Sequence, residues 1–188
     1  MADKKISALI VVDVQKCFCP GGALPVPHGD DVVPVINRIE NAFDIIIFTK
    51  EGHPENHCSF KEYGGIWPKH GVKNTDGAKF HPELSLPSKI RVMMIEKGTD
   101  PNKEAYSGFD GTDLEKLLKE NGVKRVYVCG LATDYCVKET ALDAKKVGFE
   151  TYVIIDACRG VNAKHGDVAR AIKEMKKAGI QIIISREV

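Results

Sequence analysis

Cys136 is the best candidate for nucleophilic chemistry in the sequence. The β-branched apolar run Val126–Cys129 is typical of a buried strand. Thr133 or Asp134 can then cap a helix that ends at Gly148, which places Cys136 in the first helical turn. Unpaired backbone N–H groups and the helix dipole favour a thiolate there, and they can hold an oxyanion after the sulfur attacks a carbonyl. The alternative is an ordinary buried cysteine.

Two further reactive side chains follow predicted strands. Asp13 comes directly after the apolar run Ile6–Val12, and Lys97 follows the run Ile90–Ile95. The carboxyl ends of parallel strands meet at one edge of a sheet, where ligands gather. A carboxylate can take the proton of Cys136, and an ammonium can lower the thiol pKa and hold developing charge. Singly, each has a simpler role, as a turn cap for Asp13 or a solvated lysine for Lys97.

A second constellation is Glu51-x-His53-x-x-x-His57, followed by His70. Imidazole nitrogens and carboxylate oxygens suit zinc, iron or manganese, and an open position leaves room for water. The surrounding residues, about 50–89, hold four of the six histidines and the only tryptophan. A loop this long inside a compact domain usually has a function. Histidines on an ordinary surface loop are the alternative.

The remaining elements position these groups. Apolar periodicity and turn residues predict helices at 31–42 and 112–122, the second opened by a Thr112-x-x-Glu115 capping box, and a last helix around Val168 and Met175. The strands are expected at 6–12, 45–49, 90–95, 126–129, 151–155 and 180–184. We therefore predict an α/β fold, a three-layer αβα domain with a mostly parallel six-stranded sheet. It is expected to span 1–188 as one domain, with an excursion at about 50–89.

Composition excludes several classes of function. The 27 Lys+Arg residues balance 26 Asp+Glu residues, and no basic block suggests a nucleic-acid partner. The longest apolar runs are single strands, too short to span a membrane. Six scattered cysteines fit a reduced, cytoplasmic protein better than a disulfide framework, and Cys17-x-Cys19 is a weak metal signal. The sequence leaves a homo-oligomer open.

Six segments together resemble the nicotinamidase branch of the isochorismatase-like cysteine hydrolase superfamily, over almost the whole chain. They are Leu-Ile-Val-Val-Asp-Val-Gln (9–15), Pro-Gly-Gly-Ala-Leu-Pro-Val (20–26), His-Pro-Glu-Asn-His (53–57), Trp-Pro-Lys-His (67–70), Lys-Glu-Ala-Tyr-Ser-Gly-Phe (103–109) and Gly-Leu-Ala-Thr-Asp-Tyr-Cys-Val (130–137). The resemblance implies the isochorismatase-like hydrolase fold. It also implies hydrolysis of nicotinamide to nicotinic acid and ammonia, activity on pyrazinamide, and a place in NAD salvage.

The resemblance implies a catalytic triad of Asp13, Lys97 and Cys136. Asp13 would deprotonate Cys136, whose thiolate would form a thioester with the substrate. The backbone N–H groups of Ala132 and Cys136 would hold the oxyanion. In the family the peptide bond before the position of Ala132 is typically cis, a rare state for a residue other than proline.

The resemblance also implies a cofactor and a substrate pocket. One divalent metal ion, zinc first with iron or manganese as alternatives, would bind the pyridine nitrogen of the substrate. Its ligands would be Glu51, His53, His57 and His70. The aromatic residues that match pocket positions are Phe18, Trp67 and Tyr106, and a flat ring stacks well between aromatic faces.

The chain departs from the family pattern at the metal loop. Glu51 replaces the usual aspartate, and Gly52 replaces the aromatic residue that usually follows it. Lys16 and Cys17 also replace an Asn/Asp-type pair. Two other functions therefore stay open. One is a cysteine hydrolase for another small amide or a vinyl ether, which a metal-free site would favour. The other is a catalytically silent binding domain on the same fold.

Overall fold

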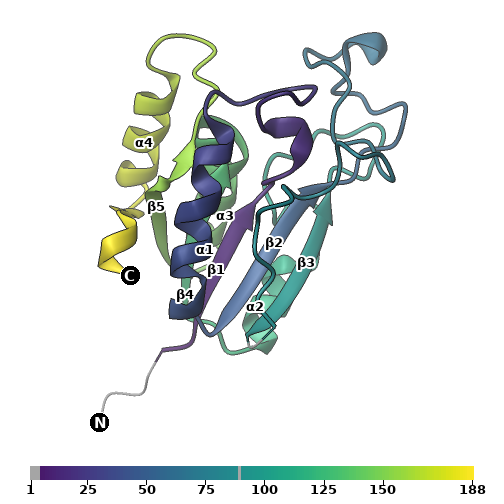
Figure 1. Cartoon of the computed structure of the whole chain (residues 1–188). Helices are drawn as coiled ribbons and strands as arrows, with labels where there is room; N and C mark the ends of the chain where they lie inside the picture. The colour runs from purple at the N-terminus through teal and green to yellow at the C-terminus, as the bar shows by residue number, and fades with distance from the viewer. Residues whose placement is uncertain (1–4, 89) are drawn as a thin grey trace.

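The protein is built around a six-stranded parallel sheet, seen in the computed structural model in Figure 1. The structure describes residues 5–88 and 90–188, so residues 1–4 of the predicted domain and residue 89 of the predicted excursion lie outside the described residues. The strand order is β3-β2-β1-β4-β5-β6, and all neighbours run parallel. The strands are β1 (Ser7–Val12), β2 (Ile45–Glu51), β3 (Arg91–Lys97), β4 (Arg125–Leu131), β5 (Glu150–Arg159) and β6 (Gln181–Ile183).

Helices cover both faces of this sheet, which confirms the predicted three-layer αβα fold. In Figure 1, α1 lies in front of the sheet and α2 and α3 lie behind it. The helices are α1 (Val32–Ile39), α2 (Leu114–Glu120), α3 (Lys138–Lys146) and α4 (Asp167–Lys177). Short 3₁₀ turns occur at Lys16–Phe18, Gly29–Asp31, Glu40–Ala42, Lys61–Tyr63 and Ser185–Glu187.

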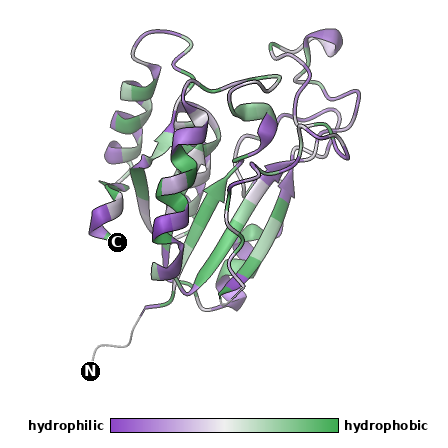
Figure 2. Cartoon of the chain, in the orientation of Figure 1, coloured by the Kyte–Doolittle hydropathy of each residue, from purple (hydrophilic) through white to green (hydrophobic). Residues whose placement is uncertain are grey.

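The core lies on both sides of the central strands. Every residue from Ala8 to Val12 in β1 is fully buried, and the apolar residues of β2 are buried as well. Figure 2 shows the strands as the most hydrophobic part of the chain and the upper loops as largely hydrophilic. A strand that is buried on both faces has a continuous apolar sequence, and such continuous runs predicted these strands.

Two local predictions are wrong. Neither Thr133 nor Asp134 caps α3 through its side chain, because a π-helical turn, Thr133–Val137, precedes the helix. The Thr112 capping box does not form either: the Thr112 hydroxyl accepts the N–H of Leu114 at 3.2 Å, and Glu115 pairs with Lys119 on the helix surface.

Strand β5 is longer than its apolar run. It continues beyond the predicted end at Ile155 to Arg159, after an irregularity in its pairing with β4. Val128 pairs with Val153, whereas Gly130 pairs with Cys158. The extension brings the chain after β5 to the carboxyl edge of the sheet, beside the turn that holds Cys136.

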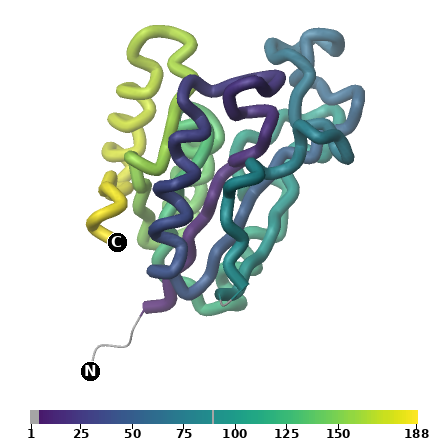
Figure 3. Tube along the Cα trace, in the orientation of Figure 1, coloured from purple at the N-terminus to yellow at the C-terminus, as the bar shows by residue number. Residues whose placement is uncertain are grey.

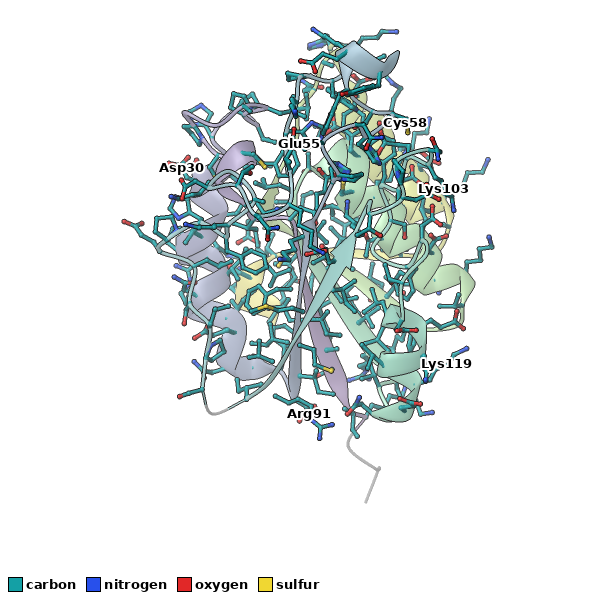
Figure 4. All side chains as sticks on the ribbon, turned by 90° about the vertical axis from the view of Figure 1, so that its right-hand side faces the viewer. Asp30, Glu55, Cys58, Arg91, Lys103 and Lys119 are labelled. Atoms are coloured by element: carbon teal, nitrogen blue, oxygen red, sulfur yellow. The ribbon has the colours of Figure 1, made fainter. Side chains whose placement is uncertain are left out.

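The long excursion lies above the carboxyl ends of β2 and β3, and the chain then returns to the start of β3 (Figure 3). Isolated bridges such as His53 with Val72 and Phe60 with Trp67, together with turn hydrogen bonds, order its backbone. Figure 4, viewed from the β3 edge, places Glu55, Cys58 and Lys103 in the upper part of the molecule and Arg91 at its lower end. The excursion, to which Glu55 and Cys58 belong, therefore lies at the end of the sheet opposite to Arg91, where β3 begins.

Candidate active site

The turn after β4 places Cys136 at the carboxyl edge of the sheet. Gly130 has φ 108°, and a Cβ there would lie 2.2 Å from the carbonyl oxygen of Val12, so only glycine fits between β1 and β4. The Leu131–Ala132 peptide bond, just after Gly130, is cis, as the resemblance to the family implies. The Ala132 carbonyl then accepts the N–H groups of Tyr135 and Val137, both at 3.1 Å. This tight turn leaves Cys136 buried but facing a pocket.

Asp13, Lys97 and Cys136 meet at this edge. The Lys97 Nζ atom lies 2.9 Å from Asp13 Oδ2 and 3.4 Å from Cys136 Sγ. A carboxylate oxygen of Asp13 lies within 4.8 Å of the same sulfur. The Thr49 hydroxyl donates to Asp13 Oδ1 at 2.7 Å, and Lys97 donates to the Ala105 carbonyl at 3.2 Å. Three side chains, from the turn after β4, the end of β3 and the residue after β1, thus form one buried cluster.

Burial controls the protonation of the cluster. It raises the pKa of Cys136 well above the usual value although Lys97 opposes this, so the prediction that this location favours the thiolate is wrong for the free protein. Burial also raises the pKa of Asp13 against the effect of Lys97. Burial alone would lower the pKa of Lys97, but Asp13, Cys136 and Glu51 hold it well above its usual value. The thiol therefore keeps its proton beside a carboxylate of raised basicity.

Glu51, His53 and His70 form a second buried cluster beside the first. Glu51 Oε2 lies 2.9 Å from His53 Nε2 and 3.1 Å from His70 Nε2. The other ring nitrogens lie 2.7 Å from backbone carbonyls, His53 Nδ1 from that of Gly98 and His70 Nδ1 from that of Pro68. A carbonyl acceptor at Nδ1 leaves the Nε2 lone pair free to bind a metal, as is usual for metal-ligating histidines.

The donor atoms of this cluster fit a metal ion. Among the described residues, Glu51 Oε2 and His53 Nε2 are buried without a hydrogen bond of acceptable geometry, despite their short separation. A carboxylate oxygen and an imidazole lone pair repel each other unless a proton or a metal cation lies between them. Burial opposes the charged form of His53, but Glu51 outweighs it and raises the His53 pKa. One carboxylate and two imidazoles are the ligand types that zinc, iron and manganese share.

Glu51 also joins the two clusters. Its second oxygen, Oε1, lies 3.2 Å from Lys97 Nζ. Burial alone would raise the pKa of Glu51, but Lys97, His53 and His70 hold it well below its usual value. Gln15, which the sequence interpretation missed, fixes the backbone: its amide donates to the Glu51 carbonyl at 2.9 Å and accepts the Glu51 N–H at 2.8 Å. The extra methylene of glutamate thus reaches the histidines and the lysine together.

His57 is the one predicted metal ligand that lies outside this cluster of donor atoms. Its ring stacks on His53 with 3.9 Å between ring centroids. Its Nε2 lies 3.1 Å from the Lys103 carbonyl, and its Nδ1 lies 2.8 Å from the Ser59 hydroxyl. Burial and the neighbouring His53 lower the pKa of His57. Both nitrogens are engaged with protein groups, and a ligand role for His57 stays a prediction.

A pocket of about 410 Å³, including its open mouth, reaches both clusters. The three predicted aromatic residues, Phe18, Trp67 and Tyr106, line it, and Trp67 Nε1 donates to the Tyr106 hydroxyl at 3.0 Å. Burial raises the pKa of Tyr106 to about 12, so its hydroxyl keeps its proton. The sequence interpretation missed five further wall residues: Leu24, Val26, Leu131, Tyr135 and Val161. The mostly apolar wall with its aromatic residues suits a small flat ligand.

The comparisons with known proteins agree with this geometry. The model of the isochorismatase domain matches residues 7–187. This chain belongs to the isochorismatase family. It is 41% identical to a nicotinamidase of Acinetobacter baylyi, over 96% of this chain and 94% of that protein.

Two solved structures are also similar. The pyrazinamidase of Pyrococcus horikoshii in complex with zinc is 54% identical with a TM-score of 0.86, over 95% of this chain and 98% of that one. The PnC1 protein of L. infantum in complex with nicotinate is 36% identical with a TM-score of 0.90, over 97% and 94% of the two chains. The family and the fold implied by the sequence motifs are confirmed.

Proposed function

We propose that this protein is a hydrolase that converts nicotinamide to nicotinic acid and ammonia through a thioester on Cys136. The observation on which this rests is the position of Lys97 Nζ, within 3.4 Å of both the Cys136 sulfur and the Asp13 carboxylate, at the base of an aromatic pocket. Relatives named nicotinamidase and pyrazinamidase match nearly the whole chain, which supports this substrate class.

The first half of the reaction forms the thioester. Asp13 takes the proton of Cys136, and the thiolate attacks the carboxamide carbon. Backbone N–H groups of Ala132 and Cys136 donate hydrogen bonds to the carbonyl oxygen as negative charge develops on it. Asp13 returns its proton to the amide nitrogen, the C–N bond breaks, and ammonia leaves. Lys97 stabilises the carboxylate and the thiolate at each stage.

The second half releases the acid. A water molecule enters where ammonia left, and Asp13 takes one of its protons as the oxygen attacks the thioester carbon. The same backbone donors hold the oxyanion. The C–S bond then breaks, Cys136 regains the proton from Asp13, and nicotinic acid leaves the pocket. The raised pKa of Asp13 suits both transfers because the group must take up and release a proton in turn.

Glu51, His53 and His70 would hold one divalent metal ion, with zinc the first candidate because the similar pyrazinamidase structure is a zinc complex. A bound ion supplies a Lewis-acid contact for the pyridine nitrogen of the substrate. The residues of the chain do the rest of the positioning. Phe18, Trp67 and Tyr106 border the flat ring, whose carboxamide then lies over Cys136.

The same contacts fit pyrazinamide, which differs from nicotinamide only within the ring, so we propose it as a second substrate.

Each of the six cysteines, all within the described residues, has a free thiol. Residues 5–88 and 90–188 include no helix long and apolar enough to cross a membrane. We propose that the protein acts in the cytoplasm and that its reaction belongs to NAD salvage. All proposed groups come from one chain, so the reaction does not require a homo-oligomer.

An ammonia-release assay with purified protein tests this function. We expect steady release from nicotinamide, loss of release after thorough chelation, and recovery when zinc, iron or manganese is restored. Activity that survives removal of the metal, verified by elemental analysis, would exclude the metal role. Absence of ammonia from the metal-loaded protein would exclude the proposed substrate.

A further inference from the structure

Asp134 connects the turn that holds the nucleophile to the loop that follows β5. Its Oδ1 accepts the N–H of Val161 at 2.9 Å, and its Oδ2 accepts the N–H of Asn162 at 2.7 Å. Each oxygen therefore makes one charge-assisted hydrogen bond to consecutive backbone N–H groups. Asp134 lies two residues before Cys136, within the π-helical turn, so the contact ties the two segments together at the carboxyl edge of the sheet.

The loop after β5 depends on this contact for its shape. At Gly160 a Cβ would lie 2.2 Å from Val168 Cγ2 and 3.0 Å from Asp134 Oδ1, so the backbone passes close to both. Asn162 has φ 51°, a conformation that most side chains disfavour. Its side-chain oxygen accepts the N–H of Val168 at 3.4 Å. The carboxylate of Asp134 binds the backbone of the exposed Asn162 in this conformation.

Val161 lies between Gly160 and Asn162 and lines the pocket, whereas Asp134 does not line it. We infer that Asp134 is a positioning residue that fixes Val161 as a wall of the pocket and so limits the size of the ring that the site accepts. The kinetic consequences of this inference rest on the proposed amidase function. The structural part of the inference, that Asp134 orders the loop after β5, is independent of that function.

The kinetic consequence concerns substrate binding more than chemistry. Both hydrogen bonds of the Asp134 carboxylate go to the loop after β5, and Asp134 does not line the pocket, so we expect its loss to disturb that loop more than the reacting groups. Asp134→Asn keeps the size of the side chain but replaces one accepting oxygen by an NH₂ group that faces a backbone N–H. We expect KM for nicotinamide to rise about tenfold, because a charged hydrogen bond between Asp134 and the loop that carries Val161 is lost. The value of kcat should stay within about threefold of the wild type.

Ring size gives the second readout. We expect Asp134→Asn to lose less kcat/KM on 5-methylnicotinamide than on nicotinamide, because a displaced wall admits the extra methyl group. Val161→Ala should shift the same ratio in the same direction. If Asp134 acts through Val161, the double variant should change the ratio by less than the product of the two single changes.

Asp156→Asn is the matched control. The Asp156 carboxylate accepts the backbone N–H of Ser185 at 2.8 Å and the Ser185 hydroxyl at 2.6 Å, so it fixes a loop in the same way. It does not line the pocket. We expect KM and the ring-size ratio of Asp156→Asn to match those of the wild type. In a double variant with Val161→Ala, the ratio should equal the product of the two single changes.

Trypsin cleavage after the exposed Lys164, followed by mass spectrometry, tests the structural part even if nicotinamide is not the substrate. Cleavage should be faster in Asp134→Asn than in the wild type and in Asp156→Asn. Unchanged cleavage would overturn the inference. So would a fall in kcat with KM unchanged, or the same kinetic change in Asp156→Asn. A wild-type protein inactive on every nicotinamide would instead overturn the proposed function, leaving the cleavage result to decide on Asp134.

Discussion

Two groups of charged side chains lie at opposite ends of the sheet, and they differ in almost every physical respect. Near the amino end of β4, the Glu150 carboxylate accepts hydrogen bonds from the exposed Lys5 at 2.8 Å and from the half-buried Tyr152 at 2.6 Å and Arg125 at 3.1 Å. These hydrogen bonds, from Lys5 first, then Tyr152 and Arg125, lower the pKa of Glu150 to about 2. Every charge has a partner and water nearby.

The cluster at the carboxyl end is buried and incompletely satisfied. Asp13, Glu51 and Lys97 are each at most 3% exposed. Within the described chain, Asp13 Oδ2 and Glu51 Oε2 have no hydrogen bond of good geometry. Taking such charges out of water costs several kcal/mol per ion before they are paired. The surface group is therefore an ordinary ion-pair network, whereas the buried group is expensive to maintain and indicates a functional site.

The largest expected difference between the two groups is in activity. Asp13→Asn removes the proposed base, and we expect kcat/KM for nicotinamide to fall about 1,000-fold. The matched surface change, Glu150→Gln, should leave kcat/KM unchanged. Ammonia release by both purified variants measures this, with circular dichroism to verify folding. Comparable losses in the two variants would remove the functional distinction between the ends of the sheet.

The second difference is in stability. Lys97→Met leaves the carboxylates of Asp13 and Glu51 buried without their cation, so we expect it to lower the free energy of unfolding by about 3–5 kcal/mol. Arg125→Met removes an exposed partner of Glu150 and should cost only about 0–1 kcal/mol. Urea unfolding of the metal-free proteins gives both values. Equal costs would mean that the buried ammonium does not balance these carboxylates.

The third prediction concerns metal affinity. Glu51→Ala should weaken zinc binding by at least about tenfold, while Glu51→Asp should hold or raise the affinity because a carboxylate remains in place. Elemental analysis and zinc titration of the purified variants measure this, with Glu150→Gln as the control carboxylate change. Equal metal content in wild type and Glu51→Ala would exclude Glu51 as a ligand.

The smallest effect is a shift along the pH axis. The pKa of Asp13 is raised from the usual 3.8, mainly by burial. Asp13 must be ionised to take the thiol proton, so kcat/KM should fall as the pH drops through this raised value. We therefore expect the acid limb of the pH profile to lie above the pH at which an exposed aspartate titrates. An acid limb at or below that pH would contradict the assignment of Asp13 as the base.

Much of this organisation was predictable from the sequence because it depends on local pattern. Continuous apolar runs marked the buried strands, and residues placed just after three of them proved to be neighbours. The ends of helices were less predictable. Asp134 has the type of a helix cap, but its carboxylate binds the loop after β5, 27 and 28 residues further along the chain.

The pocket walls show the same limit. Tyr135 stood beside the nucleophile in the motif, yet sequence alone could not say that its ring faces Trp67 rather than solvent. Gln15 and Val161 reach the site only because strands distant in sequence are adjacent in the sheet. His57 was expected among the metal ligands from its spacing, and its ring nitrogens lie beside Lys103 and Ser59, so its ligand role stays a prediction. Such assignments depend on tertiary contacts that spacing does not encode.

The measurement that tests the central claim most directly is the fate of Cys136 during turnover. Metal-loaded protein mixed with nicotinamide and quenched in acid should contain a nicotinoyl group on the peptide with Cys136, and Cys136→Ala should release no ammonia above background. Cys129→Ala, which changes a buried cysteine of β4 outside the pocket, should remain active. Sustained ammonia release by folded Cys136→Ala would contradict the account.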